Sequence, residues 1–252
     1  MAHHPPFEQV EASRPPFNAS TTFTYTQTPN TAWQFGDGAN TKQDQQQHQK
    51  HITIDPHAPS RTPSSNYKLL ISAVIPRPIA FLSTRSQDGT TTNLAPFSYF
   101  QLISHDPPLF IVSFACPLPP HPSAKDSLRN LHATGECVIN IISEGFVEAA
   151  NSTSVNAPYG VSEWAVSGLT PVYDCETVGC ARVGEAVFAI EGRVESLREL
   201  PSRARPGEVG STLAVIEGTR FWAREDALDE EAGGVIDAKV GFLWLYLFFF
   251  FA

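Results

Sequence analysis

Three residues at the predicted start of a helix, Lys125, Asp126 and Ser127, have the side chains of an anion-binding site. The helix is predicted for residues 127–134, with Asp126 or Ser127 as its capping residue and Gly135 just past its end. A lysine ammonium, a serine hydroxyl and the unpaired N–H groups of a helix N-terminus all attract negative charge. The pattern favours a phosphate monoester, and an ordinary helix start with a solvated lysine is the alternative.

Two neighbouring hydroxyls, Ser83 and Thr84, end an apolar segment that is predicted as a strand over residues 79–84. Asp88-Gly89 then signals a hairpin, because glycine adopts a positive φ without steric cost. At the mouth of that hairpin, either hydroxyl can donate to a phosphate or to a ring carbonyl. Surface hydroxyls beside a turn are the alternative.

The return strand, predicted for residues 92–100, carries Pro96 within an apolar segment. Proline has no N–H for a ladder hydrogen bond, so Pro96 implies a sheet edge or a bulge. A bulge would free backbone N–H and C=O groups around Ala95 and Phe97, beside an aromatic wall. Such groups suit the edge of a flat heterocycle, and a purely structural kink is the alternative.

Short strands separated by turn residues dominate the middle of the chain. Further strands are predicted over residues 109–115, 137–142, 186–197 and 212–223, and short helical segments over residues 67–71 and 146–152. Many short strands with few helices indicate a mainly β domain, either a barrel or a sandwich.

Composition limits the classes of partner. The chain has 252 residues, enough for one full-sized domain with tails, and a net charge of −9. An acidic balance argues against nucleic acid, whose phosphates require clustered Lys and Arg. The four cysteines lack metal-binding spacing and indicate reduced, mostly buried thiols in a cytoplasmic protein. We expect no metal site, no secretory signal and no membrane span.

Both ends differ in composition from the predicted domain, which covers residues 63–240. Residues 1–62 are rich in Pro, Thr, Gln, Asn and His without apolar periodicity, which predicts a disordered N-terminal tail. Residues 241–252 are an aberrant apolar C-terminal tail, shorter than the roughly 20 residues of a membrane span. That tail is either a short hydrophobic strand or anchor, or the product of an unspliced intron whose pyrimidine tract encodes phenylalanine.

Several motifs in register resemble the flavin reductase-like family, which has the FMN-binding split-barrel fold. They are PRPIAFLST from Pro76, NLAPFSYF from Asn93, DPPL from Asp106, KDSLRNL from Lys125, GECVINI from Gly135 and GLTP from Gly168. The resemblance implies a six-stranded antiparallel split β-barrel with a few short helices. It also implies a homodimer that binds FMN near the subunit interface.

The resemblance further assigns the binding residues. It implies that Ser83 and Thr84 contact the flavin phosphate or ribityl chain, and that Lys125, Asp126 and Ser127 hold the phosphate. The isoalloxazine ring would be lined by the next segment, with Asn93, Ala95, Pro96, Phe97 and Ser98. Relatives commonly have Thr where this chain has Ser127, and both supply a hydroxyl. The chain departs from the family after residue 240, where the aromatic run replaces a polar, glycine-containing segment.

The implied activity is that of a flavin oxidoreductase. NAD(P)H would stack over FMN and pass hydride from its C4 to the flavin N5, and electrons would continue to an unidentified acceptor. FMN is favoured over FAD. Because the isoalloxazine supplies the chemistry, no catalytic side chain is nominated. The alternative is a non-catalytic FMN-binding protein that stores, delivers or senses the flavin. A folding-deficient product of a faulty gene model is a third hypothesis.

Overall fold

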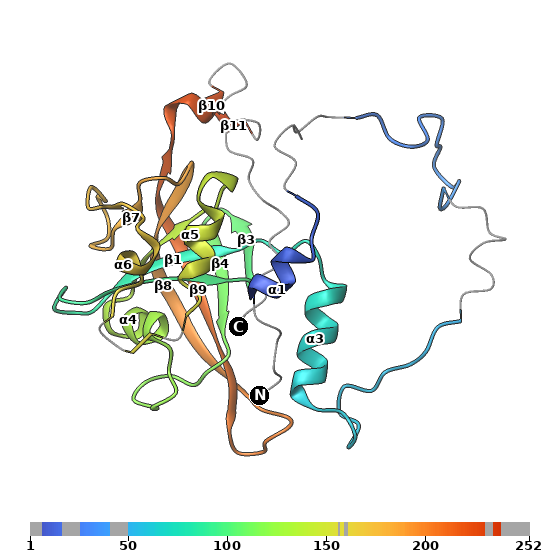
Figure 1. Ribbon diagram of the computed structural model, residues 1–252, viewed down its shortest axis with the longest axis horizontal. Coiled ribbons are helices and arrows are strands. Elements are labelled where there is room, and N and C mark those ends of the chain that lie inside the picture. Colours follow the sequence, from blue (N-terminus) through green and yellow to red (C-terminus); the bar gives the residue numbers. More distant parts are fainter. Residues whose placement is uncertain are drawn as a thin grey trace.

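Seven antiparallel strands form the main sheet of the computed structural model, which describes residues 7–16, 26–40, 50–155, 157–158, 161–229 and 234–237. The strands are β1 (Ala80–Arg85), β2 (Thr92–Phe97), β3 (Phe100–His105), β4 (Pro108–Phe114), β5 (Glu136–Asn140), β8 (Phe188–Pro201) and β9 (Val209–Ala223). Their order across the sheet is β2-β1-β5-β8-β9-β4-β3. In Figure 1, β8 and β9 form a long ribbon that extends beyond the other strands.

The two edges of this sheet are joined by the chain itself. β2 and β3 lie at opposite ends of the strand order, yet only Ser98 and Tyr99 separate them in sequence. At this bend the Ser113 N–H of the segment β4 donates to the Tyr99 carbonyl at 2.9 Å, and the rings of Phe97 and Phe114 lie 4.7 Å apart. The sheet therefore closes into a barrel. Counted with β2 and β3 as one bent strand, it has the six strands expected, and the mainly β prediction is confirmed.

The remaining elements are short. Two-stranded ribbons pair β6 (Pro171–Val172) with β7 (Arg182–Val183) and β10 (Leu228–Asp229) with β11 (Val235–Ile236). The helices are α1 (Phe7–Ala12), α3 (Pro63–Ala73), α4 (Asp126–Thr134), α5 (Val147–Ser152) and α6 (Glu163–Ser167), with 3-10 turns η1 (Glu144–Phe146) and η2 (Glu225–Ala227). The helical segment expected at residues 67–71 is thus part of the longer α3.

Alternating side chains give the barrel its core. In β9 every second residue from Thr212 to Gly218 is buried, as a strand with one face inward requires. β1 is buried on both faces: Leu82 packs in the barrel interior, whereas Phe81 packs in a second cluster with Phe146 and Trp164. The interior cluster includes Leu128 and Leu131 of α4, so this helix is held against the barrel by apolar burial.

The turn and thiol predictions agree with the structure. Gly89 has φ +72° in the β1–β2 hairpin. All four cysteines are free thiols, and three of them, Cys116, Cys137 and Cys180, are buried.

The predicted tails remain predictions. The described residues between 26 and 40 are all exposed, and α1 is the one helix among the described residues before α3. Residues 241–252 lie outside the described part of the chain. Within the described ranges, every helix is too short or too polar to cross a bilayer.

Candidate functional site

The N-terminus of α4 lies beside the β1–β2 hairpin and has no side-chain cap. The helix starts with Lys125 as its N-cap residue, at φ −69° and ψ 150°, and ends before Gly135 at φ +69°. The expectation that Asp126 or Ser127 would be the cap is wrong, because the extended backbone continues through Lys125. In the part of the chain that the structure describes, no side-chain cap satisfies the first-turn N–H groups of α4, and uncapped groups of this kind can bind an anion.

Two hydrogen bonds bring the three predicted binding segments together. The Asn93 amide of β2 donates to Ser127 Oγ on α4 at 2.7 Å. The Asn130 amide, one turn further along α4, donates to Thr84 Oγ1 on β1 at 3.1 Å. Thr84 and Asn93 are also direct cross-strand partners. All four side chains are buried, so the contacts are shielded from water.

Strand alternation divides the predicted residues between two faces. Thr84, Asn93, Ala95 and Phe97 share the face that carries α4, because the partners of Ala95 and Phe97 are Leu82 and Ala80 of the interior cluster. These pairs follow from the register Ala80↔Phe97, Leu82↔Ala95 and Thr84↔Asn93.

Ser83 and Pro96 point to the opposite face of the hairpin. Ser83 is buried opposite Leu94, and Pro96 lies opposite Phe81. Leu94 and Phe81 both belong to the second apolar cluster. Ser83 and Pro96 are therefore not brought to α4, whereas Ser98 lies at the bend that follows β2.

Pro96 marks a sheet edge rather than a bulge. The register of β2 with β1 is unbroken along the strand, and β2 is the outermost strand of its sheet. The outward N–H of Leu94 donates to Glu163 Oε2 of α6 at 3.3 Å. Backbone N–H and C=O groups alternate in direction along an antiparallel strand, so the backbone nitrogen of Pro96, like that of Leu94, points away from β1. The missing N–H of Pro96 therefore removes no hydrogen bond between β2 and β1. The outer edge of β2 thus offers mainly carbonyl acceptors.

Lys125 links the helix start to the aromatic wall. Its Nζ lies 5.7 Å from the centroid of the Phe97 ring, within cation–π range, and the side chain is exposed. Its backbone N–H donates to Cys116 Sγ at 3.4 Å. Burial raises the pKa of the neighbouring Asp126, and Arg129 opposes this shift. The start of α4 therefore combines the exposed ammonium group of Lys125 with the partly buried carboxyl group of Asp126.

Two residues of this region were not predicted. Asn130 lies three positions after Ser127 in the KDSLRNL motif, and this spacing places both on one helix face, which is a signal that could have identified it. Glu163 carried no such signal, because α6 has only five residues.

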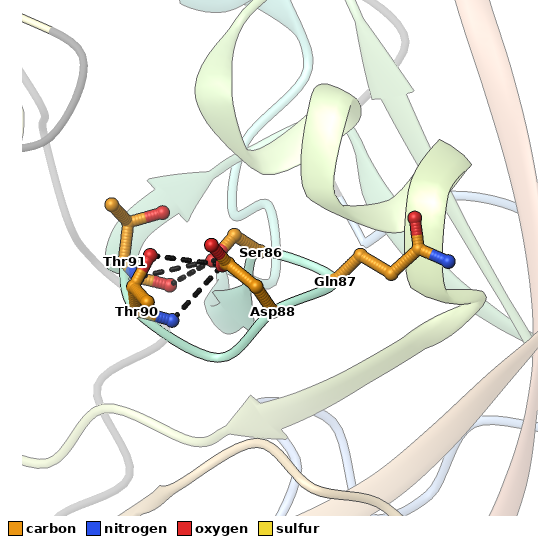
Figure 2. Close-up of a pocket in the computed structure, with 5 residues that line it drawn as sticks. All are labelled: Ser86, Gln87, Asp88, Thr90 and Thr91. Carbon is orange, nitrogen blue, oxygen red and sulfur yellow. Dashed lines mark hydrogen bonds between the residues drawn. The ribbon is translucent and has the colours of Figure 1, made fainter.

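A shallow pocket at the tip of the β1–β2 hairpin is a different feature. It is lined by Ser86, Gln87, Asp88, Thr90 and Thr91 (Figure 2). The Asp88 carboxylate accepts from the Ser86 hydroxyl at 2.6 Å and from the Thr90 N–H and hydroxyl at 3.1 and 2.9 Å. These bonds, the one from Ser86 first, lower the pKa of Asp88 to about 2. Since Ser86 and Thr90 of the same turn bind the Asp88 carboxylate and no predicted binding residue lines the pocket, we interpret it as part of a tight turn.

The described residues contain no group of three or more His, Cys, Asp and Glu side chains that could hold a metal ion. The polar constellation at β1, β2 and α4 is built from hydroxyl, amide and ammonium groups. Such groups recognise phosphates and heterocycles.

Known proteins share this architecture. Residues 72–246 match the flavin reductase like domain, and the chain belongs to that family. An uncharacterized protein of Halalkalibacterium halodurans, BH2278, is 34% identical over 184 residues, which is 73% of this chain and 83% of that protein.

Two solved structures are similar to this chain both in fold and in sequence. Nitrilotriacetate monooxygenase component B from Bacillus cereus has a TM-score of 0.68 and 31% identity, over 76% of this chain and 89% of its own. The 2-nitrobenzoate 2-nitroreductase NbaA of Pseudomonas fluorescens has a TM-score of 0.60 and 25% identity, over 73% and 81%. The chain is therefore a split-barrel protein of a flavin oxidoreductase family.

Proposed function

We propose that the chain binds FMN between the β1–β2 hairpin and α4, and that it passes hydride or electrons from NAD(P)H through this flavin to an acceptor. The observation that carries the proposal is the convergence of Thr84, Asn93 and Ser127, which come from three separate segments and are joined by hydrogen bonds. The similarity to a monooxygenase component and to a nitroreductase supports a role in reduction.

The groups at the start of α4 fit a phosphate monoester. The first-turn N–H groups have no side-chain cap, and Lys125 adds a positive charge. Ser127 Oγ accepts from Asn93, so its own hydroxyl hydrogen remains to donate to a phosphate oxygen. Because this site takes a terminal phosphate, it favours FMN over FAD.

The groups along β2 fit a flat heterocycle. Phe97 supplies an aromatic surface next to Lys125, and Ala95 lies on the same face of β2. Thr84 Oγ1 accepts from Asn130, which leaves its hydroxyl hydrogen for the ligand. Bound FMN would supply the hydride and electron chemistry, and the chain's residues bind and orient it.

The test is an absorbance spectrum of the purified protein from about 300 to about 600 nm, before and after anaerobic addition of NADH or NADPH. Flavin bands that bleach would support the reductase. Bands that persist would favour the non-catalytic flavin binder. Failure to take up FMN supplied in excess would overturn the proposal.

A further inference from the structure

The short helix α6 is fastened to the outer edge of β2 at two consecutive positions. The hydroxyl of Ser162, which precedes the helix, forms a hydrogen bond of 3.0 Å with the hydroxyl of Thr92. Glu163 then accepts from the Leu94 N–H at 3.3 Å. These contacts flank Asn93, the β2 residue that donates to Ser127. α6 therefore helps to hold the predicted flavin-binding strand, which also pairs with β1 along its length.

Glu163 is a carboxyl group in an unfavourable place for a negative charge. Glu163 is only 6% exposed, and its side chain accepts from the Leu94 N–H at 3.3 Å. Burial raises the pKa of Glu163, and the nearby Asp126 carboxylate raises it further. The backbone N–H groups of Glu163 itself and of Leu94 oppose these effects.

Few titratable side chains lie on the elements that pack against α6. β2 contributes no titratable side chain, and α5, which packs on α6, contributes the exposed Glu148. From α4 comes Asp126, which lies between Lys125 and Ser127 at the predicted phosphate position. A phosphate bound there would add negative charge beside Asp126, which already acts on Glu163.

We propose that Glu163 is a positioning residue of the FMN site, which fixes the edge of β2 through Leu94 and weakens phosphate binding when it is ionised. This inference rests on the proposed function. It predicts that the affinity for FMN depends on the protonation of one buried carboxyl, whereas the affinity for riboflavin, which lacks the phosphate, does not.

The direction of the pH dependence follows from the charges. A bound phosphate favours the protonated form of Glu163, so FMN binding takes up a proton at this carboxyl. The contribution of Glu163 to FMN affinity therefore becomes more favourable as the pH falls. Because the phosphate of FMN itself takes up a proton at a pH of about 6, this contribution is measured as the difference between the wild type and a Glu163 variant at each pH. The protonated carboxyl still accepts from Leu94 through its carbonyl oxygen.

The experiment compares the wild type with Glu163→Gln by calorimetric titration of FMN and of riboflavin, at about pH 7.5 and about pH 5.5. Glutamine keeps an acceptor for Leu94 and removes the charge. We expect Glu163→Gln to bind FMN about three- to tenfold more tightly than the wild type at the higher pH, and we expect a smaller ratio at the lower pH. Riboflavin affinity should be the same in both proteins.

Two further variants separate positioning from charge and from folding. Glu148→Gln, the matched control on α5, should reproduce the wild-type pH profile. Glu163→Ala removes the acceptor as well, so it should weaken both FMN and riboflavin binding, and Glu163→Gln should restore riboflavin binding. Thermal unfolding of each variant shows whether it is folded.

The outcomes are distinct. The same FMN pH profile in the wild type and in Glu163→Gln would overturn this inference and leave the proposed function intact. Absence of FMN binding by every variant and by the wild type would overturn both.

Discussion

Lys125 is the residue that joins the two halves of the proposed ligand site. It begins α4, where the helix dipole favours an anion, and its ammonium group also lies over the Phe97 ring. The side chain is exposed, so its ammonium group can move toward a phosphate without loss of buried contacts. We expect a charge in this position to affect ligand binding more than the stability of the fold.

We expect Lys125→Ala to weaken FMN binding. The loss of one charge-assisted hydrogen bond costs about 1.5–3 kcal/mol, which is about ten- to 150-fold in the dissociation constant. Fluorescence titration of FMN measures this change. Lys68→Ala, at an exposed lysine of α3, is the control and should leave the affinity unchanged. Equal affinity in wild type and Lys125→Ala would remove Lys125 from the site.

The sequence predicted which segments form the candidate site better than it predicted which of their side chains face it. Thr84 and Ser83 are adjacent hydroxyls, and only the strand register shows that Thr84 faces α4. Alternation could not decide between them, because β1 is buried on both faces and its apolar residues run without a polar break. Asn93 and Ser127 were predicted, and the hydrogen bond between them is what the structure adds.

At the scale of elements, one buried carboxylate ties three separate segments together. Glu191 of β8 accepts from the backbone N–H groups of Glu176 and Thr177, from the Thr177 hydroxyl, and from the indole N–H of Trp222 on β9. Burial alone would raise the pKa of Glu191. The donors outweigh it, the Thr177 hydroxyl first among them, and lower the pKa to about 2.

Glu191→Gln should therefore destabilise the protein in a pH-dependent way. The amide group of glutamine faces donors only, so we expect a loss of about 2 kcal/mol in the free energy of unfolding at pH near 7. Because the folded-state pKa is depressed, the carboxylate stabilises the fold above its ordinary pKa and loses this effect as the pH falls through about 2. Urea unfolding at about pH 7 and about pH 3 should show the difference between variant and wild type shrinking.

Glu195→Gln provides the comparison for that experiment. Glu195 is exposed on the same strand, so its substitution should change the free energy of unfolding by less than about 0.5 kcal/mol at either pH. A constant deficit of Glu191→Gln across this pH range would show that Glu191 contributes by packing rather than by charge.

The main strands were predictable, and some short elements were not. β4, β5, β8 and β9 follow runs of β-branched and aromatic residues bounded by turns. β3 was missed because the chain bends at Ser98-Tyr99 and continues as a strand with exposed apolar side chains, where no period distinguishes the inner face. The two-stranded ribbons and the five-residue α6 are fixed by tertiary contacts, since segments of this length have little intrinsic preference.

For the molecule as a whole, the outer edge of β3 has no strand partner among the described residues. It is an edge strand, and the side chains of Leu102 and Ile103 are 51% and 50% exposed, with Tyr99 40% exposed just before them. An exposed apolar edge strand pairs readily with another chain unless it is covered. We propose that a second copy of this chain covers it, in the homodimer that the family resemblance implies.

This proposal predicts a particle of twice the chain mass in size-exclusion chromatography with light scattering. Ile103→Glu should convert it to a monomer, because a carboxylate on the covered edge would be buried without a partner. Val155→Glu changes an equally exposed apolar residue away from β3 and should leave the dimer intact. A monomeric wild type at micromolar concentration would contradict the proposal.

The bend at Ser98-Tyr99 has a consequence for the life of the protein in the cell. The strand that lines the proposed ligand site is also the strand whose bend closes the barrel. A ligand bound along β2 would therefore stabilise the closed barrel. Well above its dissociation constant, the stabilisation grows with the logarithm of the free ligand concentration. Without a ligand, the barrel would open more often at the Ser98-Tyr99 bend and expose its backbone to proteases. Flavin supply would then govern how long each copy survives.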